Sequence, residues 1–274
     1  MTTTTATPAL ACDCHIHLYD ASLALAPTAT FKPPHAPLTD YRRVQAALGL
    51  DRVILVQPTG YGFDNRGLLD ALAQLGDSAR GIATVPEDVS DAELQRLHAA
   101  GVRGVRFMMI AGAGGVLPWS ALEGMAARIA PLGWCINLQL DGRDLPRHLN
   151  VLKRLPGKLV IDHTGKFLEP VPVTDPAFKA LLSLLDKPRR WIKLAAPYET
   201  SKLGPPHYAD VAVLAKALLD AHSDRCVWAS NWPHPNRHPV PRDAELLALL
   251  TDWVAEEAVR ERVLVTNPAS AFGF

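Results

Sequence analysis

Short apolar runs alternate with longer segments of helical period along almost the whole chain. The runs are rich in Val, Ile and Leu and lie at 11–15, 52–57, 80–85, 102–107, 134–138, 158–162, 191–194 and 225–229. Such alternation is typical of repeated strand–helix units, whose strands form a parallel sheet. Eight units in 274 residues predict a (β/α)₈ TIM barrel.

The segments between the runs carry apolar residues at spacings of three and four, as amphipathic helices do. They lie at 38–48, 65–75, 91–100, 119–132, 145–155, 175–185, 208–222 and 242–257. Ser90 followed by Glu93 is a helix N-terminus signature at the third segment. Little sequence remains for anything else, so we expect residues 1–274 to form a single barrel domain, with 1–10 flexible.

The proline-rich segment 27–37, which follows the first run, is the largest insertion into this pattern. In a (β/α)₈ barrel the loops after the strands surround the active site, so this segment is a candidate lid. The alternative is a rigid surface connection without a functional contact.

Composition disfavours several classes of partner. The 28 basic and 28 acidic residues cancel, which argues against nucleic acid or an anionic membrane. The first residues lack the features of a signal peptide and no long stretch is continuously apolar, so we expect a cytoplasmic protein. The four cysteines form no CxxC pair, and we expect no disulfide framework. The oligomeric state cannot be read from the sequence.

The first strand ends in a cluster of polar residues at the rim where this fold builds its sites. Asp13, His15 and His17 alternate, and they would share the interior face if the strand stays extended. Two histidines at i and i+2 can point at one centre, which suits a divalent metal or proton transfer. A histidine pair of this kind also occurs often without such a function.

Two further strand ends carry histidine. His163 follows the sixth run, and Asn231 and His234 follow the eighth. For any one of these histidines, a hydrogen-bonded structural role is the simpler interpretation. Their coincidence at three strand ends favours one shared site instead. The remaining histidines, at 35, 98, 148, 207, 222 and 238, lie in helices or loops and are expected to face solvent.

Other strand ends offer groups for binding a substrate. These are Gln57 and Thr59 after the second run, Arg106 in the fourth, Gln139 after the fifth, Lys193 in the seventh, and Tyr198 and Glu199 beyond it. Arg106 shares a strand face with Gly104. If that face is interior, the Arg106 guanidinium would hold a substrate carboxylate. A structural salt bridge beneath the site is the alternative for Arg106.

Three motifs together resemble the amidohydrolase-related (amidohydrolase 2) family. They are the Asp13-x-His15-x-His17 pattern, VIDHTGKF around His163 and VWASNWPHPN around Asn231. The stretches RVILVQPTGYGFDNRGLLDAL, GVRGVRF, WIKLAAPYETSK and LVTNPASAFGF resemble the branch that contains pyrone dicarboxylate lactonase and D-galactarolactone isomerase. The resemblance implies an enzyme that opens a lactone with water, or that moves an acyl group between hydroxyls of a sugar acid.

Asn231 stands where many members of the resembled family carry an aspartate that acts as general base or metal ligand. An amide does not accept a proton at neutral pH, and it brings no negative charge to a metal. The resemblance implies zinc in members outside the branch and metal-independent chemistry in many members inside it. We therefore expect no cofactor; were zinc bound, its ligands would be His15, His17 and His163.

The leading hypothesis is a metal-independent hydrolase that acts on a polar or sugar-acid lactone. Imidazoles of His15, His17 and His163 would polarise the carbonyl, and His163 or His17 would accept the proton of the nucleophile that Asn231 positions. Asp13 would orient His15 or its neighbour. The binding groups would be Arg106 for a carboxylate, and Gln57, Thr59, Gln139, Lys193, Tyr198 and His234 for the rest of the substrate.

Three alternatives remain open. A galactarolactone-type isomerase shares the carbonyl-addition step, and Asn231 together with segments such as LQLDGRDL favours it, whereas the complete DxHxH pattern is more typical of the hydrolases. A catalytically lapsed binding protein and a metal-dependent decarboxylase or amidase are the others. The FMMIAGAGG stretch after Arg106 lacks a further basic residue, which disfavours a strongly anionic aromatic lactone.

Overall fold

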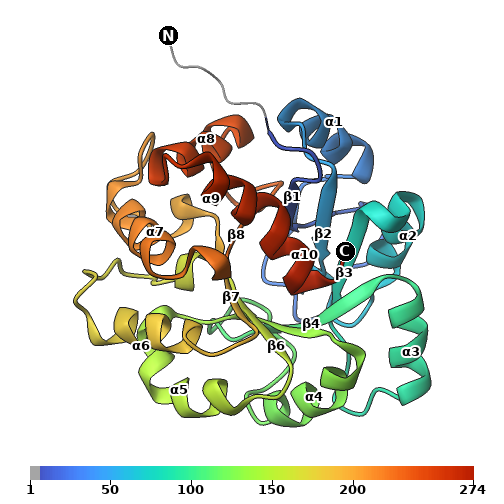
Figure 1. The fold of residues 1–274 in the computed structure, drawn as a ribbon. Coiled ribbons are helices and arrows are strands. Elements are labelled where there is room, and N and C mark those ends of the chain that lie inside the picture. The colour runs from blue at the N-terminus through green and yellow to red at the C-terminus, as the bar shows by residue number, and fades with distance from the viewer. Residues whose placement is uncertain (1–6) are drawn as a thin grey trace.

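A computed structural model describes residues 7–274 and contains eight parallel strands in sequence order around a barrel (Figure 1). The strands are β1 (Cys12–Ile16), β2 (Arg52–Val56), β3 (Ala79–Ala83), β4 (Val102–Met108), β5 (Cys135–Gln139), β6 (Lys158–Ile161), β7 (Arg190–Leu194) and β8 (Cys226–Trp228). The predicted fold class and all eight predicted strands are confirmed, with ends that differ by one or two residues.

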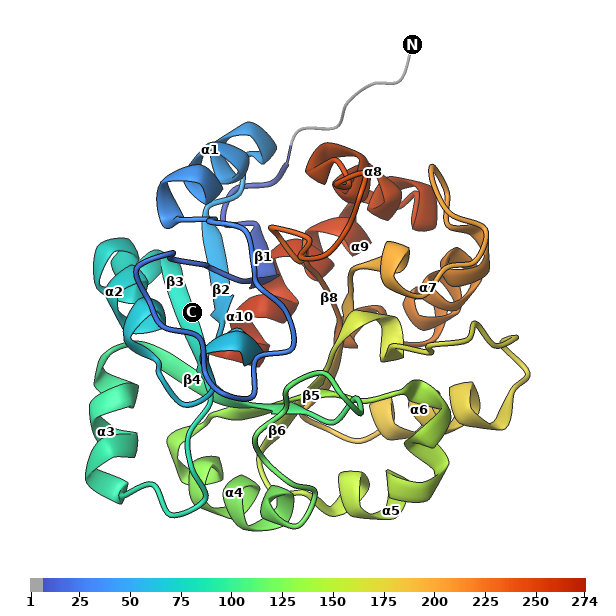
Figure 2. The same cartoon turned by 180° about the vertical axis from the view of Figure 1, so that it is seen from behind.

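Helices surround the strands (Figures 1 and 2). They are α1 (Leu38–Leu48), α2 (Arg66–Leu75), α3 (Asp91–Ala99), α4 (Ala121–Ile129), α5 (Leu145–Arg154), α6 (Pro176–Leu185), α7 (Ala209–His222), α8 (Asp243–Trp253), α9 (Glu257–Glu261) and α10 (Asn267–Phe272). The predicted cap forms, because the Ser90 hydroxyl accepts a hydrogen bond from the Glu93 backbone N–H at 3.1 Å. None of the helices in this described part is long and apolar enough to cross a membrane.

The C-terminal helix α10 was not among the predicted elements. It crosses the end of the barrel that faces the viewer in Figure 1, where the strands begin. Lys158 and Arg80, from the starts of β6 and β3, donate hydrogen bonds to carbonyls at its C-terminal end. Phe272 packs among the apolar side chains of the barrel interior. The helix closes this end of the barrel and leaves the opposite end for a site.

The barrel closes between β1 and β8 beyond the end of the short strand β8. The Asn231 backbone N–H donates to the His15 carbonyl at 3.0 Å, and the His17 N–H donates to the Trp232 carbonyl at 2.8 Å. These two backbone hydrogen bonds therefore fix Asn231 next to His15 and His17.

A long segment between β1 and α1 covers the mouth of the barrel. It appears in dark blue across the front of Figure 2. The backbones of Tyr19 and Ala36 exchange two hydrogen bonds, of 3.0 and 2.8 Å, which tie its two ends together. Of the residues expected to be flexible, 1–6 lie outside the described part, whereas the Thr7 hydroxyl donates to the Leu48 carbonyl at 2.6 Å.

Candidate active site

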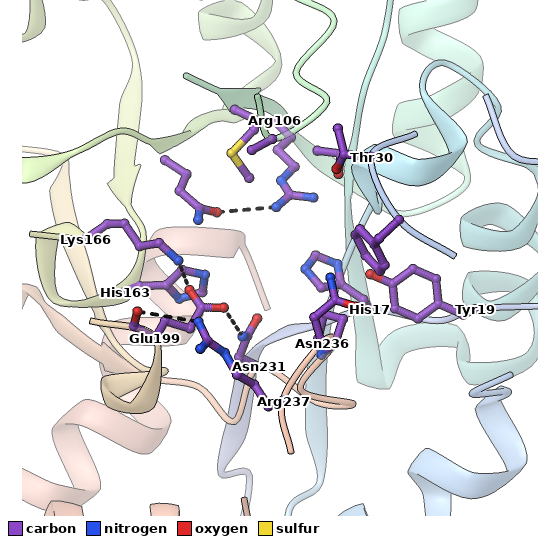
Figure 3. A pocket seen from close by; sticks show the side chains of 16 residues that line it. His17, Tyr19, Thr30, Arg106, His163, Lys166, Glu199, Asn231, Asn236 and Arg237 are labelled. Atoms are coloured by element: carbon purple, nitrogen blue, oxygen red, sulfur yellow. Dashed lines mark hydrogen bonds and ion pairs between the residues drawn. The ribbon is translucent and has the colours of Figure 1, made fainter. Parts of the chain in front are cut away.

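A polar cavity of about 380 Å³ opens at the C-terminal ends of the strands (Figure 3). Its lining comprises His17, Tyr19, Thr30, Phe31, Thr59, Arg106, Met108, Ala113, Gln139, His163, Lys166, Glu199, Asn231, Pro235, Asn236 and Arg237. The predicted site residues His17, His163, Asn231, Thr59, Arg106 and Gln139 are thus brought together. A cavity of this size accommodates a small polar molecule.

His15 and His17 form a hydrogen-bonded pair whose proton positions follow from their partners. His17 Nδ1 lies 2.8 Å from the Val56 carbonyl, which can only accept, so Nδ1 carries the proton. His17 Nε2 therefore accepts from His15 Nε2, 3.1 Å away. Burial lowers the pKa of both imidazoles well below its usual range, so both are neutral near pH 7.

Lys193 and Asp162 support His15 from below. Lys193 Nζ lies 3.0 Å from His15 Nδ1, 2.5 Å from Asn137 Oδ1 and 3.1 Å from Asp162 Oδ1. Burial alone would raise the pKa of Asp162, but the Lys193 ammonium outweighs it and holds that pKa well below its usual range. Both His15 and Lys193 are fully buried and neither lines the cavity. His15 therefore acts on the cavity through His17, and Lys193, which was predicted to bind substrate, lies beneath the cavity and outside its lining.

Asp13 does not share a face with His15, contrary to the prediction. The register of β1 against β2 shifts between Asp13 and Ile16, and this irregularity breaks the expected alternation. The Asp13 carboxylate accepts hydrogen bonds from Tyr41 and from the N–H and hydroxyl of Ser230, away from the cavity. It also accepts from the His15 backbone N–H at 3.3 Å, so it holds the main chain of His15 and not its imidazole. Burial raises the pKa of Asp13 to about 6.

His163 reaches the cavity through left-handed backbone. Its φ is 53° and that of Thr164 is 55°, values that are uncommon outside glycine. This turn follows directly on β6 and separates Asp162, which contacts Lys193, from His163, which lines the cavity. Among the described residues His163 has no hydrogen-bond partner at Nδ1. Burial lowers its pKa well below the usual range, so a neutral imidazole is free to bind a ligand.

Asn231 also has left-handed backbone, with φ of 62°. Its Nδ2 donates to the Tyr198 hydroxyl at 2.9 Å and to Glu199 Oε1 at 3.3 Å. Tyr198 in turn contacts His234 Nδ1 at 2.8 Å, and His234 Nε2 lies 2.9 Å from Asp243. The structure therefore places Tyr198 and His234, which were predicted to bind substrate, behind Asn231 and outside the cavity lining.

Lys166 and Arg237 line the cavity without having been predicted. Glu199, which the sequence placed among the strand-end polar groups without a role, lines it as well. Lys166 Nζ and Glu199 Oε2 form an ion pair, and Figure 3 shows both side chains beside His163 and Asn231. Burial and the nearby Arg237 lower the pKa of Lys166 to about 7, while contact with the Glu199 carboxylate favours its charged form. Lys166 lies in the VIDHTGKF motif, three residues after His163, and that spacing was the signal available.

Arg106 projects into the cavity from β4. Its Nη1 donates to the Gln57 carbonyl at 2.7 Å and its Nη2 to Gln139 Oε1 at 3.4 Å. None of the carboxylates in the described residues forms an ion pair with Arg106, which rules against the structural salt bridge. Its Nε is buried and has no hydrogen-bond partner among residues 7–274. The Gln57 side chain instead donates to the carbonyls of Gly62 and Asp64 and is absent from the cavity.

The segment 27–37 contributes Thr30 and Phe31 to the cavity lining, which is the position that the lid hypothesis requires. The Phe31 ring lies 6.3 Å from that of Tyr19, measured between centroids. The histidines at 35, 98, 148, 207, 222 and 238 do not line the cavity, and none of them is buried.

Three potential ligand atoms, from His15, Asp162 and His163, lie within 4.8 Å of one another. The group does not fit a tightly held divalent cation. The Lys193 ammonium already neutralises Asp162, the carboxylate of the group, at 3.1 Å. Asn231 adds an amide and no negative charge. A second positive charge here would lack compensating anions.

The sequence and the structure were compared with known proteins. The model of the amidohydrolase family matches residues 12–274. D-galactarolactone isomerase of Agrobacterium fabrum is 34% identical over 270 residues, which cover 97% of this chain and 91% of that protein. The 2-pyrone-4,6-dicarboxylate hydrolase of Comamonas testosteroni is 34% identical over 272 residues, covering 95% and 89%.

Further similarity extends to a third enzyme and to a solved structure. The 4-sulfomuconolactone hydrolase of Hydrogenophaga intermedia is 32% identical over 267 residues, covering 95% of this chain and 88% of that protein. An apo crystal structure of an Agrobacterium tumefaciens protein superposes with a TM-score of 0.92 at 34% identity and covers 98% of this chain and 97% of that one.

Proposed function

Because the chain belongs to the amidohydrolase family, we propose that it is a lactonase, which opens a polar or sugar-acid lactone by adding water to the carbonyl carbon. The observation that carries the proposal is the cavity itself, where His163, Asn231 and Arg106 meet at the mouth of the barrel. Three relatives that match over most of their length are named as two lactone hydrolases and one lactone isomerase.

His163 is the donor that polarises the lactone carbonyl. Its neutral imidazole has an unpartnered Nδ1 and lines the cavity, so one of its N–H groups can meet the oxygen on which negative charge develops. The His17 Nδ1 proton is committed to the Val56 carbonyl, and the His15 Nε2 proton to His17. These two histidines therefore shape the floor of the site beside His163, whose ring centroid lies 4.9 Å from that of His15.

The charges that line the cavity favour an acidic substrate. Arg106, Lys166 and Arg237 contribute cationic side chains, and Glu199 contributes an anionic one. Arg106 has a buried Nε without a partner and two nitrogens fixed by carbonyl oxygens, so its guanidinium is held ready for a substrate carboxylate. Gln139 and Thr59 beside it suit hydroxyl groups. A sugar-acid lactone combines these features.

We propose further that the reaction proceeds without a metal ion, because the Lys193 ammonium already provides the positive charge beside His15 and Asp162. Hydrolysis and isomerisation share the addition to the carbonyl. They differ in whether the attacking oxygen belongs to water or to a substrate hydroxyl. Asn231 and the 34% identity to a galactarolactone isomerase support isomerisation as the second candidate.

A screen of aldonic and aldaric lactones by NMR tests the proposal, with an enzyme-free sample to correct for spontaneous opening. Appearance of the open hydroxy acid identifies a lactonase. Interconversion of ring sizes without acid identifies an isomerase. If no lactone in the panel changes faster than in the enzyme-free sample, both assignments fail.

A further inference from the structure

The cavity lacks the carboxylate that an aspartate at position 231 would provide, yet addition of water to a lactone needs a base. Asn231 cannot accept a proton at neutral pH. Of the described residues that line the cavity, Glu199 is the one with a carboxylate. It comes from the short 3₁₀ turn Pro197–Glu199 that follows β7, so it enters the cavity from the strand next to β8.

Glu199 is held in place at both oxygens. Its Oε1 accepts a hydrogen bond from Asn231 Nδ2 at 3.3 Å, and its Oε2 pairs with Lys166 Nζ. Its side chain is only 13% exposed, so the carboxylate is largely shielded from bulk water while it faces the cavity (Figure 3). A carboxylate fixed beside the residue that positions the nucleophile is placed to receive the nucleophile's proton.

The imidazoles are less suited to this step. His17 already uses both nitrogens, Nδ1 to donate to Val56 and Nε2 to accept from His15. His163 is free, but it is the neutral donor required at the carbonyl oxygen. The contacts of Glu199 with Lys166 and Asn231 both use it as an acceptor, and a carboxylate has further acceptor sites for the nucleophile's proton.

We propose that Glu199 is the general base of this site and takes over the task of the carboxylate that Asn231 replaces; this proposal rests on the lactone chemistry proposed above. The oxygen of water, or of a substrate hydroxyl, forms a bond to the carbonyl carbon as its proton moves to the Glu199 carboxylate. The carbonyl π electrons move to the oxygen held by His163. When the bond from carbon to the ring oxygen breaks, the protonated Glu199 returns its proton to that leaving oxygen, and no other reactant is needed.

The first test is Glu199→Gln, which keeps size and polarity but removes basicity. We expect kcat to fall by about 10²–10⁴-fold, while affinity for the hydroxy-acid product, measured by calorimetry, changes little. Glu169→Gln is the matched control, because Glu169 is an exposed glutamate paired with Lys202 at 3.1 Å on the neighbouring loop. The control should keep wild-type kcat.

The pH profile distinguishes a base from a structural residue. The groups that face Glu199 are Lys166 from the loop after β6, and Asn231 and Arg237 from the loop after β8, together with its neighbour Tyr198. In the wild type, kcat should fall on the acid side as the carboxylate becomes protonated. In Glu199→Gln that acid limb should be absent from the residual activity.

If Glu199→Gln folds poorly, Glu199→Asp keeps the proposal testable, because it preserves the carboxylate and should retain the acid limb at a lower kcat. A rescue variant is the complementary test. Asn231→Asp added to Glu199→Gln places a carboxylate at the adjacent position, and its kcat should be at least ten-fold higher than that of Glu199→Gln. Wild-type kcat in Glu199→Gln, or an unchanged acid limb, overturns the assignment of Glu199 while the lactonase activity stands. Failure of the wild-type protein to open any lactone overturns the proposed function itself.

Discussion

The proton positions in the β1 histidine pair depend on one backbone carbonyl. Val56 O can only accept, so it fixes the tautomer of His17, and His17 then fixes that of His15. Lys193 Nζ completes this chain of hydrogen bonds by donating to the remaining nitrogen of His15, Nδ1, at 3.0 Å. His15 and His17 look equivalent in the DxHxH pattern. They nevertheless have different tasks, because the partners of each ring decide which nitrogen carries the hydrogen.

Replacement of His163 should remove the donor at the carbonyl oxygen. We expect His163→Ala to lower kcat by about 10²–10³-fold, the usual effect of losing one oxyanion donor. His98→Ala is a suitable control, because His98 lies on α3 and bonds Trp134 outside the cavity. Steady-state rates on the lactone found by NMR provide the measurement, and undiminished activity in His163→Ala would show that the site is assigned wrongly.

Asp13 should matter for stability and not directly for chemistry. Its carboxylate accepts hydrogen bonds from Ser230, Tyr41 and the His15 backbone. In Asp13→Asn the new NH₂ group would face some of these donors, so we expect a loss of about 1–3 kcal/mol in the free energy of unfolding. Urea titration measures it, with the exposed Asp70→Asn as control.

The loss in the free energy of unfolding caused by Asp13→Asn should also depend on pH. Folding raises the pKa of Asp13 from 3.8 to about 6, so the folded state favours the protonated acid. The stability that this provides is complete below about pH 4 and is lost as the pH rises through about 6. The difference in the free energy of unfolding between the wild type and Asp13→Asn should therefore be larger at acid pH than at neutral pH. A difference that grows with pH would contradict the raised pKa.

The segment between β1 and α1 works as a cover because both of its ends are fixed. Tyr19 and Ala36 pair through their backbones, and Ala26 N–H donates to the Gly60 carbonyl at 2.8 Å. Between these points the chain brings Thr30 and Phe31 over the cavity. A proline-rich composition limits the conformations of such a loop and keeps it in one position.

Truncation of Phe31 should open the cavity to water. Burial of a phenylalanine ring against a ligand contributes about 1.5–3 kcal/mol, so Phe31→Ala should raise KM by about ten-fold or more with a smaller effect on kcat. Phe63→Ala is the matched control, since Phe63 is 44% exposed and lies outside the cavity lining. Equal KM values for both variants would mean that the segment is only a surface connection.

Strand positions were predictable because the strands are buried on both faces and appear as short apolar runs. Helix positions were predictable because apolar residues recur at spacings of three and four. The histidines of β1, His163 and Asn231 were found because strand ends meet at one rim. The irregularity in β1 that turns Asp13 away is set by pairing with β2, which a single sequence does not reveal. Lys166 and Arg237 were missed because they lie beyond the strand ends, where loop conformation decides their direction, and for the same reason Glu199 was named without a role.

The distribution of charge through the barrel determines what the site can bind. One end is closed by α10 and apolar side chains, and the other holds a buried layer of Lys193, Asp162 and Asn137 beneath the cavity. That layer is already neutral as a unit, since the ammonium offsets the carboxylate. A divalent cation added to it would carry two uncompensated positive charges into a buried region.

Protein purified without added metal should therefore contain far less than one zinc per chain, and prolonged treatment with a chelator should leave kcat unchanged. Elemental analysis of the same sample used for kinetics makes the two measurements comparable. The matched variant is Lys193→Met with Asn231→Asp, which removes the ammonium and restores a carboxylate at the rim. Because a cation would then be compensated, this variant should bind zinc more tightly than the wild type in a calorimetric titration. Stoichiometric zinc in the wild type, with activity lost on chelation and regained with zinc alone, would show that Lys193 and the metal coexist and that the charge argument is wrong.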